Sequence, residues 1–544
     1  MKKSSFKKVA YYNDFRHLIT NISELYENKT AITFYTRNKK IDEHKYKQLA
    51  EDSISFAKGL AAAGINGKNT AIISENSYLW VASFFGIVSA GGVAVPIDTE
   101  NTGNIIHDLI KKSDCEVILI SEEMLGVLDE MSEILDKNIK IIVLGYRDEH
   151  QTFDNICAEG KDTNIDSIKI EPDQTAAIIF TSGTTAVMKP VMLTHKSILY
   201  NASDVLSMID TQNKVFNTLP FYHSYGLTCG LIAPLINGCN IAICSDVRRI
   251  IRDVELFKPY FIISVPLIVE VIYSKLLSII DSSEHAGEIH KYLNSNFAKN
   301  FFNNKTKKQL KNILIGTAFE NLKNISTGGA YMSETISKKL EKMDIIVLNG
   351  YGVTECSPVV SCNRNNNYEF KSTGEVLPGY KVKIVDDEIL IKGVSLMKGY
   401  YKEEALTSAS FEDGWFKTGD LGYLKNNKLY IRGRKKNLIV MKNGKKVSAE
   451  ELESVIKTIP LVKEVMAYGA TTGISTDDVK IAATIYPDPE QITGMTSYEI
   501  LAKLQKEVDR LNNTLPAYQQ IQMINLKEED FGRTSNFKIK RQTN

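Results

Sequence analysis

Hydroxyl side chains, glycine and a lysine gather in one short stretch of the sequence, residues 178–189 (IIFTSGTTAVMK). Its apolar start predicts a strand, and the strand runs into a loop that ends at Lys189. Hydroxyls, backbone N–H groups and an ammonium group that follow a strand together can bind phosphate. The Walker A pattern GxxxxGK[ST] is absent here. Taken by itself, the loop could equally be an ordinary turn rich in Ser and Thr.

Further motifs follow this loop in order along the chain. They are VMLTH at 191–195, NGYGVTE at 349–355, TGDLGY at 418–423, the stretch from Gly433 through Gly444 to Glu453, and NFKIKR at 536–541. With the loop, they resemble the adenylate-forming (AMP-binding) superfamily of acyl-CoA synthetases, aryl-CoA ligases, luciferases and nonribosomal adenylation domains. Within this superfamily, the motifs are most similar to those of bacterial fatty-acid–CoA ligases. The resemblance covers at least residues 175–541 and implies an acid–thiol ligase that forms acyl-AMP from ATP.

The resemblance implies binding residues for the phosphates, the adenine and the metal of Mg²⁺-ATP. Those of the phosphate loop are Thr181, Ser182, Gly183, Thr184, Thr185 and Lys189, and those of the adenine and magnesium motif are Asn349, Gly350, Tyr351, Gly352 and Thr354, with Gly329 nearby. Glu355 is the expected Mg²⁺ ligand, because a hard cation bridging phosphates takes a carboxylate and keeps several waters. Thr354 is expected to donate to the α-phosphate, and Tyr351 to lie against adenine. The substrate carboxylate and ATP are both anions and repel each other. Cations and hydrogen-bond donors therefore have to surround the phosphates.

The later motifs are expected to serve the ribose and the two half-reactions. Asp420 can accept hydrogen bonds from two ribose hydroxyls at once, although Thr-Gly-Asp alone could be a simple turn. By resemblance, Arg434 reaches the ribose and phosphates, and Lys538 bridges the attacking carboxylate and the α-phosphate. By the same resemblance, residues 442–446 form a crossover loop, in which Gly444 leaves room for the pantetheine arm of CoA. The expected catalytic set is Thr181, Lys189, His223, Thr354, Glu355 and Lys538.

The sequence departs from the family pattern at a few positions. Ala186, Met188 and Pro190 stand where Gly, Pro and Gly are common, so the phosphate loop is expected to be stiffer and to have one N–H donor fewer. Phe537 stands where a glycine often precedes the catalytic lysine, and Asn437 replaces a common acidic residue after the hinge. The altered loop could slow nucleotide handling, but the hydroxyls and Lys189 are retained, so a loss of activity does not follow.

The segment 219–227 (LPFYHSYGL) bears on the acid that is activated. It contains His223 and no carboxylate, so a substrate ammonium group would lack a counter-charge and an amino acid is disfavoured. His223 could gate the carboxylate or fill the acyl pocket, or it could simply be a packed histidine. By resemblance, 265–266, 326–330 and Gly350 line an acyl tunnel, and a medium- or long-chain fatty acid is favoured over an aryl acid.

The sequence leaves alternatives open for the thiol that accepts the acyl group and for the class of reaction. CoA and an acyl carrier protein both present phosphopantetheine, so the crossover loop does not separate them. A degenerate nucleotide-binding relative would fit the altered phosphate loop. A P-loop phosphotransferase would fit an ATP site alone, but the missing Walker A motif and the C-terminal motifs disfavour it.

Alternating strands and helices have to position these motifs. Expected helices at 103–112 and 122–136 and strands at 116–120 and 139–144 indicate an α/β fold with parallel or mixed sheets flanked by helices. After residue 370, short glycine-punctuated strands predict a β-rich subdomain, and a compact α+β pattern follows residue 436. We therefore expect an N-terminal AMP-binding and acyl-binding domain at 1–435 and a small mobile C-terminal domain at 436–544 that carries the catalytic lysine.

Composition bounds the partners and the compartment. The 544 residues include 66 Lys and Arg against 65 Asp and Glu, which gives no general field for nucleic acid. Seven scattered cysteines suit a reducing compartment, and no apolar stretch follows the basic N-terminus, so we expect a cytoplasmic protein. The uncharged stretch 78–97 is long enough for a membrane span, but Gly91, Gly92 and Pro96 favour a buried helix and a strand. We expect no integral membrane association and make no prediction of oligomeric state.

Overall fold

The computed structural model describes residues 6–35, 40–145, 150–182, 188–244, 246–295, 303–441, 445–471, 479–532, 539 and 541. The chain divides into two compact units, which are described separately. Unit 1 comprises residues 1–381 and 392–416, and unit 2 comprises residues 382–391 and 417–544.

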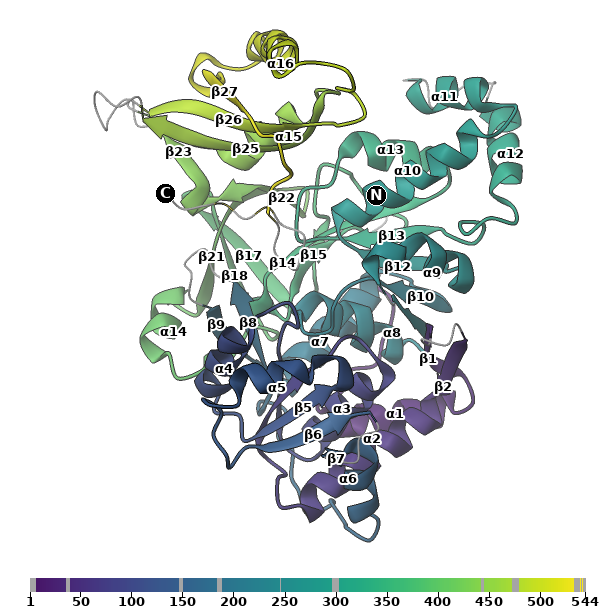
Figure 1. The fold of residues 1–544 in the computed structure, drawn as a ribbon, viewed down its shortest axis with the longest axis vertical. Coiled ribbons are helices and arrows are strands. Elements are labelled where there is room, and N and C mark those ends of the chain that lie inside the picture. Colours follow the sequence, from purple (N-terminus) through teal and green to yellow (C-terminus); the bar gives the residue numbers. More distant parts are fainter. Residues whose placement is uncertain are drawn as a thin grey trace. The chain divides into compact units, whose positions relative to one another are not determined.

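One sheet of unit 1 has a parallel centre (Figure 1). Its order is β2-β1-β11-β10-β12-β13-β14-β15-β16, with β2, β15 and β16 antiparallel to their neighbours. The strands are β1 (Thr30–Tyr35), β2 (Ile41–Lys45), β10 (Lys214–Asn217), β11 (Asn240–Ile243), β12 (Phe261–Ser264), β13 (Asn324–Thr327), β14 (Ile346–Gly352), β15 (Val359–Cys362) and β16 (Glu375–Val376). Its central strands are almost wholly buried and apolar, as expected where helices cover both faces.

A second sheet of unit 1 holds the phosphate-loop strands. Its order is β19-β9-β8-β4-β3-β5-β6-β7, and the hairpin β8–β9 is antiparallel while the strands from β8 to β7 are parallel. The strands are β3 (Asn69–Ile73), β4 (Val93–Pro96), β5 (Val117–Ser121), β6 (Lys140–Leu144), β7 (Gln151–Thr152), β8 (Thr175–Ser182), β9 (Met188–Thr194) and β19 (Gly399–Tyr400).

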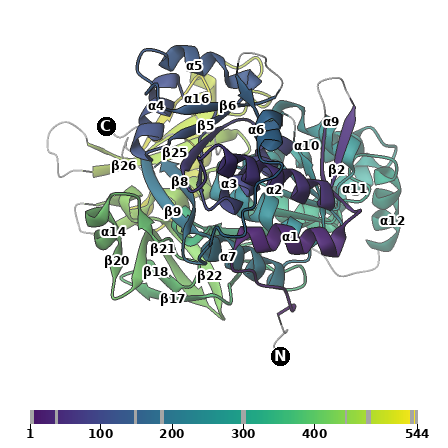
Figure 2. The same cartoon turned by 90° about the horizontal axis from the view of Figure 1, so that it is seen from below.

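Helices connect and cover these strands, and Figure 2 shows α1, α2 and α3 lying together. The helices of unit 1 are α1 (Phe15–Tyr26), α2 (Tyr46–Ala62), α3 (Tyr78–Ser89), α4 (Gly103–Lys112), α5 (Gly126–Met131), α6 (Phe153–Glu159), α7 (His195–Met208), α8 (Ala233–Ile236), α9 (Ile250–Phe257), α10 (Pro266–Asp281), α11 (Ala286–Asn294), α12 (Asn303–Leu314), α13 (Glu334–Lys342) and α14 (Glu404–Ser410). The uncharged stretch 78–97 is the buried α3 followed by β4, as predicted. Within the described residues, no helix has the length and apolar character that crossing a membrane requires.

The helix predicted at 122–136 is wrong in extent. The structure has a 3₁₀ turn at Glu122–Met124 and then the short helix α5. Beyond it, Asn138 donates its backbone N–H to the Asp136 side chain at 2.9 Å. Such local side-chain bonds offer the backbone an alternative to the helix, which the apolar periodicity of the segment does not reveal.

Unit 2 begins with strands joined by tight turns. β18 (Glu388–Gly393), β21 (Trp415–Lys425) and β22 (Lys428–Arg434) lie side by side, and β18 and β21 each extend a little into unit 1. Residues 386 and 387, before β18, and Asn426 and Asn427, between β21 and β22, all have positive φ. That is the geometry of type I′ hairpin turns, for which Asn and Asp are suited. The second turn and the bulge between Leu421 and Gly422 together set the register that pairs Asp420 with Arg434.

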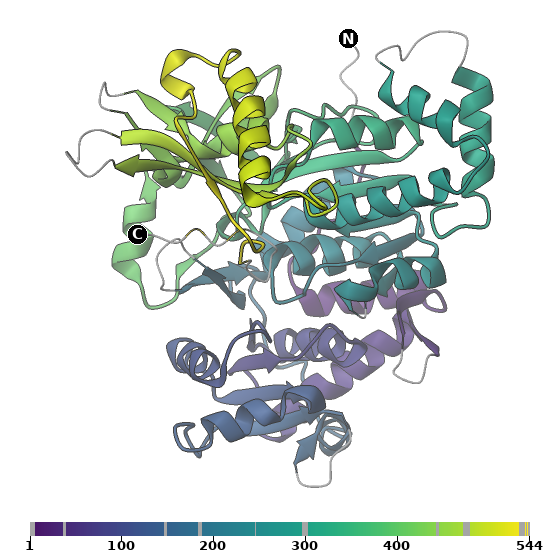
Figure 3. The ribbon, with the colours of Figure 1, turned by 45° about the horizontal axis from the view of Figure 1, so that its top comes forward.

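The rest of unit 2 is a small α+β arrangement. A sheet of β25 (Val462–Thr471), β26 (Val479–Pro487) and β27 (Met523–Leu526) packs with α15 (Ala449–Ile456) and α16 (Ser497–Asn512), and Figure 3 shows α16 lying along one face of this sheet. A two-stranded ribbon, β23 (Leu438–Val440) and β24 (Lys446–Ser448), precedes α15. The sheets of both units confirm the predicted α/β class, and the domain boundary at 435/436 stays a prediction.

Candidate active site

The β8–β9 hairpin carries the predicted phosphate loop. Thr181 lies opposite Lys189, and Ser182 lies opposite Met188, so the two strands bring both ends of the loop together. Buried Ile178 and Ile179 anchor β8 in the core. The predicted Gly183, Thr184 and Thr185 lie outside the described residues, as does Ala186.

Met188 and Pro190, the other residues of this hairpin that depart from the family pattern, each accept a hydrogen bond at the backbone carbonyl oxygen. The carbonyl oxygen of Met188 accepts a hydrogen bond from the Lys112 ammonium at 3.1 Å, and that of Pro190 accepts from the Tyr401 N–H at 2.8 Å. Proline has no N–H to offer, so its position in β9 uses the one backbone hydrogen-bonding group that it has.

Two predicted residues from separate motifs meet at a tyrosine that the sequence did not indicate. The hydroxyl of Tyr400 donates to Glu355 Oε1 at 2.9 Å, and Lys189 Nζ lies 5.2 Å from the centre of the Tyr400 ring. Burial raises the pKa of Tyr400, and the Glu355 carboxylate raises it further, so the phenol stays protonated as a donor. Tyr400 thus links the phosphate-loop lysine to the predicted magnesium ligand.

Thr354 lies beside the segment that contains His223. Its hydroxyl and that of Ser224 are 3.0 Å apart, so one donates to the other. The His223 ring is half-buried and lies 4.6 Å from the Tyr222 ring, tilted by 56°. The structure therefore brings segment 219–227, which is predicted to bear on the choice of acid, to the Thr354 hydroxyl.

Residues predicted to line the acyl tunnel also lie close together. The hydroxyls of Tyr225 and Ser326 are 3.0 Å apart. A Cβ added at Gly328 would stand 3.3 Å from the Gly350 carbonyl oxygen and 3.7 Å from the Tyr225 ring. Gly329, with φ of +84°, has a backbone conformation that favours glycine. The glycines here keep this surface free of side chains.

Strand β14 presents the predicted adenine residues. The Asn349 side chain donates to the Phe370 carbonyl at 2.9 Å, while its buried Oδ1 has no protein donor among the described residues. A buried acceptor of this kind suits a ligand amino group, because leaving it unsatisfied costs free energy. A Cβ at Gly352 would overlap the Pro358 carbonyl, so only glycine fits there. Tyr351 lies between them, half-buried.

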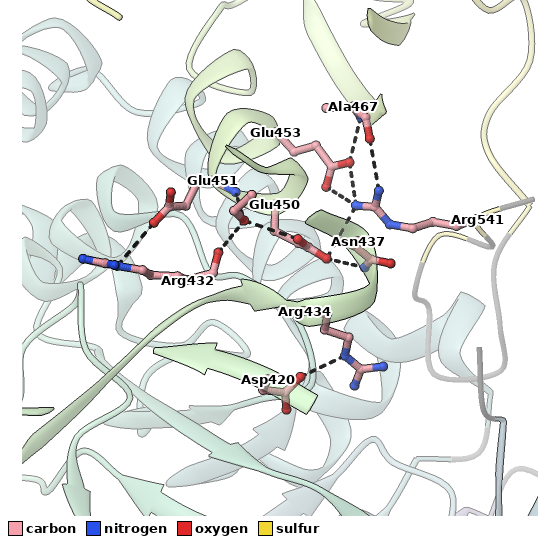
Figure 4. A network of polar contacts seen from close by, with 10 residues as sticks. Asp420, Arg432, Arg434, Asn437, Glu450, Glu451, Glu453, Ala467 and Arg541 are labelled. Carbon is pink, nitrogen blue, oxygen red and sulfur yellow. Dashed lines mark hydrogen bonds and ion pairs between the residues drawn. The ribbon is translucent and has the colours of Figure 1, made fainter. Parts of the chain in front are cut away.

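In unit 2 the predicted ribose residue has a cationic partner. Asp420, whose side chain is 6% exposed, accepts from Arg434 Nε at 3.1 Å (Figure 4). Arg434 lies on the next strand of the hairpin, far from Asp420 in the sequence, so this pairing depends on the β21–β22 register. Arg434 is predicted to reach the ribose and phosphates, and in the structure it pairs with Asp420.

A second ion pair holds Arg541 within unit 2 (Figure 4). One guanidinium nitrogen of Arg541 lies 2.6 Å from both carboxylate oxygens of Glu453, and another donates to the Ala467 carbonyl at 3.2 Å. The Ala467 N–H donates to Glu453 at 2.8 Å. Glu453 lies on α15 and Ala467 on β25, so Arg541 is held by two packed elements. The predicted Lys538 and Gly444 lie outside the described residues.

The structure explains the unusual residue after the hinge. The Asn437 side-chain amide donates to Glu450, which also lies 3.9 Å from Arg541 (Figure 4). An aspartate at 437 would place a second carboxylate against Glu450. Next to it, burial lowers the pKa of Lys436, and the nearby charges of Arg434 and Arg541 contribute to the same decrease, to about 8.

Comparison with known families gives two matches. The model described as AMP-binding enzyme matches residues 21–401, and the model described as AMP-binding enzyme C-terminal domain matches residues 436–544.

Curated proteins and solved structures are also similar. The long-chain-fatty-acid–[acyl-carrier-protein] ligase AEE15, chloroplastic, of Arabidopsis thaliana is 24% identical, over 84% of this chain and 75% of that protein. A long-chain-fatty-acid–CoA ligase of Bacillus subtilis is 25% identical, over 85% of this chain and 84% of that protein. The anthranilate CoA ligase AuaEII with anthranoyl-AMP shares the fold, with a TM-score of 0.79, 18% identity and coverage of 97% and 96%. So does o-succinylbenzoate CoA synthetase of Bacillus subtilis with ATP and magnesium, with a TM-score of 0.72, 21% identity and coverage of 96% and 98%.

Proposed function

Because the chain belongs to the AMP-binding enzyme family, we propose that it activates a carboxylic acid with ATP and passes the acyl group to a thiol. In the first half-reaction a carboxylate oxygen attacks the α-phosphorus, the bond to the bridging oxygen breaks, and acyl-AMP and pyrophosphate form. In the second, the thiol sulfur attacks the acyl carbonyl carbon, the proton of the thiol is released and AMP leaves. The enzyme is thus an AMP-forming acid–thiol ligase.

The observation that carries this proposal is the meeting of Lys189 and Glu355 at Tyr400. A cation and a carboxylate from two motifs are held at one donor, which suits the phosphates of ATP and their metal ion. Mg²⁺, when bound through Glu355, would neutralise charge on the phosphate oxygens. Lys189, Thr181 and Ser182 would bind the phosphates, and Thr354 would donate to the α-phosphate.

The remaining nucleotide and catalytic roles are proposals of the same kind. Asn349 Oδ1 would accept from the adenine amino group, with Tyr351 against the ring. Asp420, oriented by Arg434, would accept from the ribose hydroxyls. Lys538 would bridge the attacking carboxylate and the α-phosphate, and Gly444 would leave room for the pantetheine arm.

A medium- or long-chain fatty acid is the proposed substrate. The two curated relatives named above are long-chain fatty-acid ligases. The segment 219–227 has no acid to pair with an amino group, and it reaches Thr354 through Ser224. An amino acid would therefore bring an ammonium group that this segment does not neutralise.

CoA is the proposed acceptor, and an acyl carrier protein is the second candidate. The Arabidopsis relative is named for a carrier-protein acceptor and the Bacillus relative for CoA. Both acceptors offer the same phosphopantetheine thiol, so a direct comparison of holo-carrier protein with CoA at equal thiol concentration decides between them.

ATP–pyrophosphate exchange with a panel of acids tests the proposal, because adenylation is reversible and needs no acceptor. We expect exchange with fatty acids and little with free amino acids. Exchange with one amino acid alone would refute the fatty-acid proposal. No exchange with any acid, from a protein that binds ATP, would favour a degenerate nucleotide-binding relative.

We also propose the domain division at 435/436, with a mobile C-terminal domain, and a cytoplasmic location. The match of separate family models to residues 21–401 and 436–544 supports the first. The scattered cysteines, free of disulfides in the described residues, support the second. Limited proteolysis tests the boundary, because cleavage concentrated at 433–437 is expected of an exposed hinge.

A further inference from the structure

A buried glutamate of β18 contacts both the ribose motif and the residue that precedes the hinge. Glu388 is 8% exposed. Its Oε1 accepts from the backbone N–H of Gly419 at 3.1 Å, and its Oε2 lies 2.8 Å from the Lys435 ammonium. The type I′ turn at residues 386–387 starts β18 at Glu388 and so sets which way this carboxylate lies.

Strand β18 shapes the turn 418–420 through further bonds. The Thr418 hydroxyl donates to the Ile389 carbonyl at 2.7 Å and accepts from the Asp420 N–H at 3.0 Å. Gly419, between them, has φ of +69° and open space around its Cα. Its conformation, rather than crowding, therefore requires glycine, and Glu388 holds the N–H of that left-handed residue.

The pair with Lys435 gives the carboxylate its orientation. Lys435 is 61% exposed, so the ion pair by itself adds little stability. The partner N–H of Gly419 belongs to the ribose motif, and a carboxylate hydrogen bond to backbone N–H is among the stronger ones. The Glu388 pair raises the pKa of Lys435, which keeps the ammonium charged.

We propose that Glu388 is a positioning residue for the ribose of ATP, acting through Gly419 to hold Asp420, with Lys435 orienting its carboxylate. This inference rests on the proposed function. It predicts that Glu388 affects how the protein distinguishes nucleotides with and without ribose hydroxyls, which a purely structural ion pair would not do.

Equilibrium binding of ATP and of 2′,3′-dideoxy-ATP to the full-length protein tests this. The wild type is expected to bind ATP at least about tenfold more tightly, the scale of losing two charge-assisted hydrogen bonds. Glu388→Ala should reduce this preference to within about threefold. Glu388→Gln keeps an acceptor for Gly419, so it should retain most of the preference, and Lys435→Arg should retain it better than Lys435→Met.

Glu464→Ala is the matched control, because Glu464 is also a buried glutamate of unit 2 paired with a lysine, Lys457, at 2.6 Å. It should leave the ATP preference unchanged. A Glu388→Ala protein that stays folded and keeps the wild-type preference would overturn the proposal, as would equal losses in Glu464→Ala. Because binding is measured without acid or acceptor, an absence of pyrophosphate exchange would refute the proposed function without deciding the role of Glu388.

Discussion

Replacing Arg541 by alanine should destabilise unit 2 in a pH-dependent way. The substitution removes both contacts to the Glu453 carboxylate and the bond to the Ala467 carbonyl. The side chains of Glu453 and Arg541 are 15% and 29% exposed. Breaking a fully buried pair costs about 3–5 kcal/mol, and a pair this accessible should cost less, about 2–3 kcal/mol.

The dependence on pH follows from the carboxyl group. Burial raises the pKa of Glu453 to about 7, against the opposing effect of Arg541. A raised carboxyl pKa means that the folded state binds more protons than the unfolded state, so the contribution of Glu453 to stability falls as pH rises from about 4.5 to 7. Glu453 is fully ionised in the folded protein, and its ion pair with Arg541 fully formed, only at pH values above about 7. The cost of Arg541→Ala should therefore be largest near pH 8.5 and small near pH 6.

Hydrogen exchange of the peptide 462–471 and thermal unfolding at both pH values measure this cost. The peptide contains the Ala467 N–H that donates to Glu453. Arg510→Ala is the control, because Arg510 is 62% exposed and pairs with Glu507 on the surface of α16. It should cost at most about 0.5 kcal/mol. If Arg541→Ala matched this control at pH 8.5, or cost the same at both pH values, the reasoning would be refuted.

The other predictions concern the nucleotide residues, a buried histidine and the hinge. Asp420→Ala and Glu355→Ala should each lower pyrophosphate exchange by about ten- to a hundredfold, and near wild-type rates would show that a motif is misplaced. Burial lowers the pKa of His195 to about 4. The free energy of unfolding should therefore fall by up to about 3 kcal/mol as pH drops from 6.5 to 4, because the unfolded state binds the proton first. Urea unfolding of His195→Asn should not show this decrease. We expect the C-terminal domain to rotate about Lys436 between the two half-reactions, withdrawing Lys538 and bringing in Gly444. Lys538→Ala should therefore lose acyl-AMP formation yet turn over supplied acyl-AMP with thiol, and Lys436→Pro should do the reverse, because proline resists the rotation. Equal loss of both half-reactions in a folded Lys538→Ala protein would contradict this rotation.

The sequence predicted the class of the fold, because that depends on local pattern. The strand before the phosphate loop and the buried stretch 78–97 follow from composition over a few residues, whereas the site residues were expected from the family resemblance. It did not predict Tyr400 as the partner of Glu355, nor Arg434 as the partner of Asp420. Both depend on which elements become neighbours in the fold, and that information is absent from any single segment.

The partners found only in the structure share a physical task. The Tyr400 hydroxyl donates to Glu355, the Gly419 N–H donates to the Glu388 carboxylate, and Arg434 pairs with Asp420. A charged side chain that is already oriented does not have to lose its rotational freedom when substrate binds, so binding free energy remains for the transition state. Residues with no chemistry of their own can therefore affect the rate as strongly as the residues that they hold. Substitutions confined to the motifs would miss Tyr400 and Glu388.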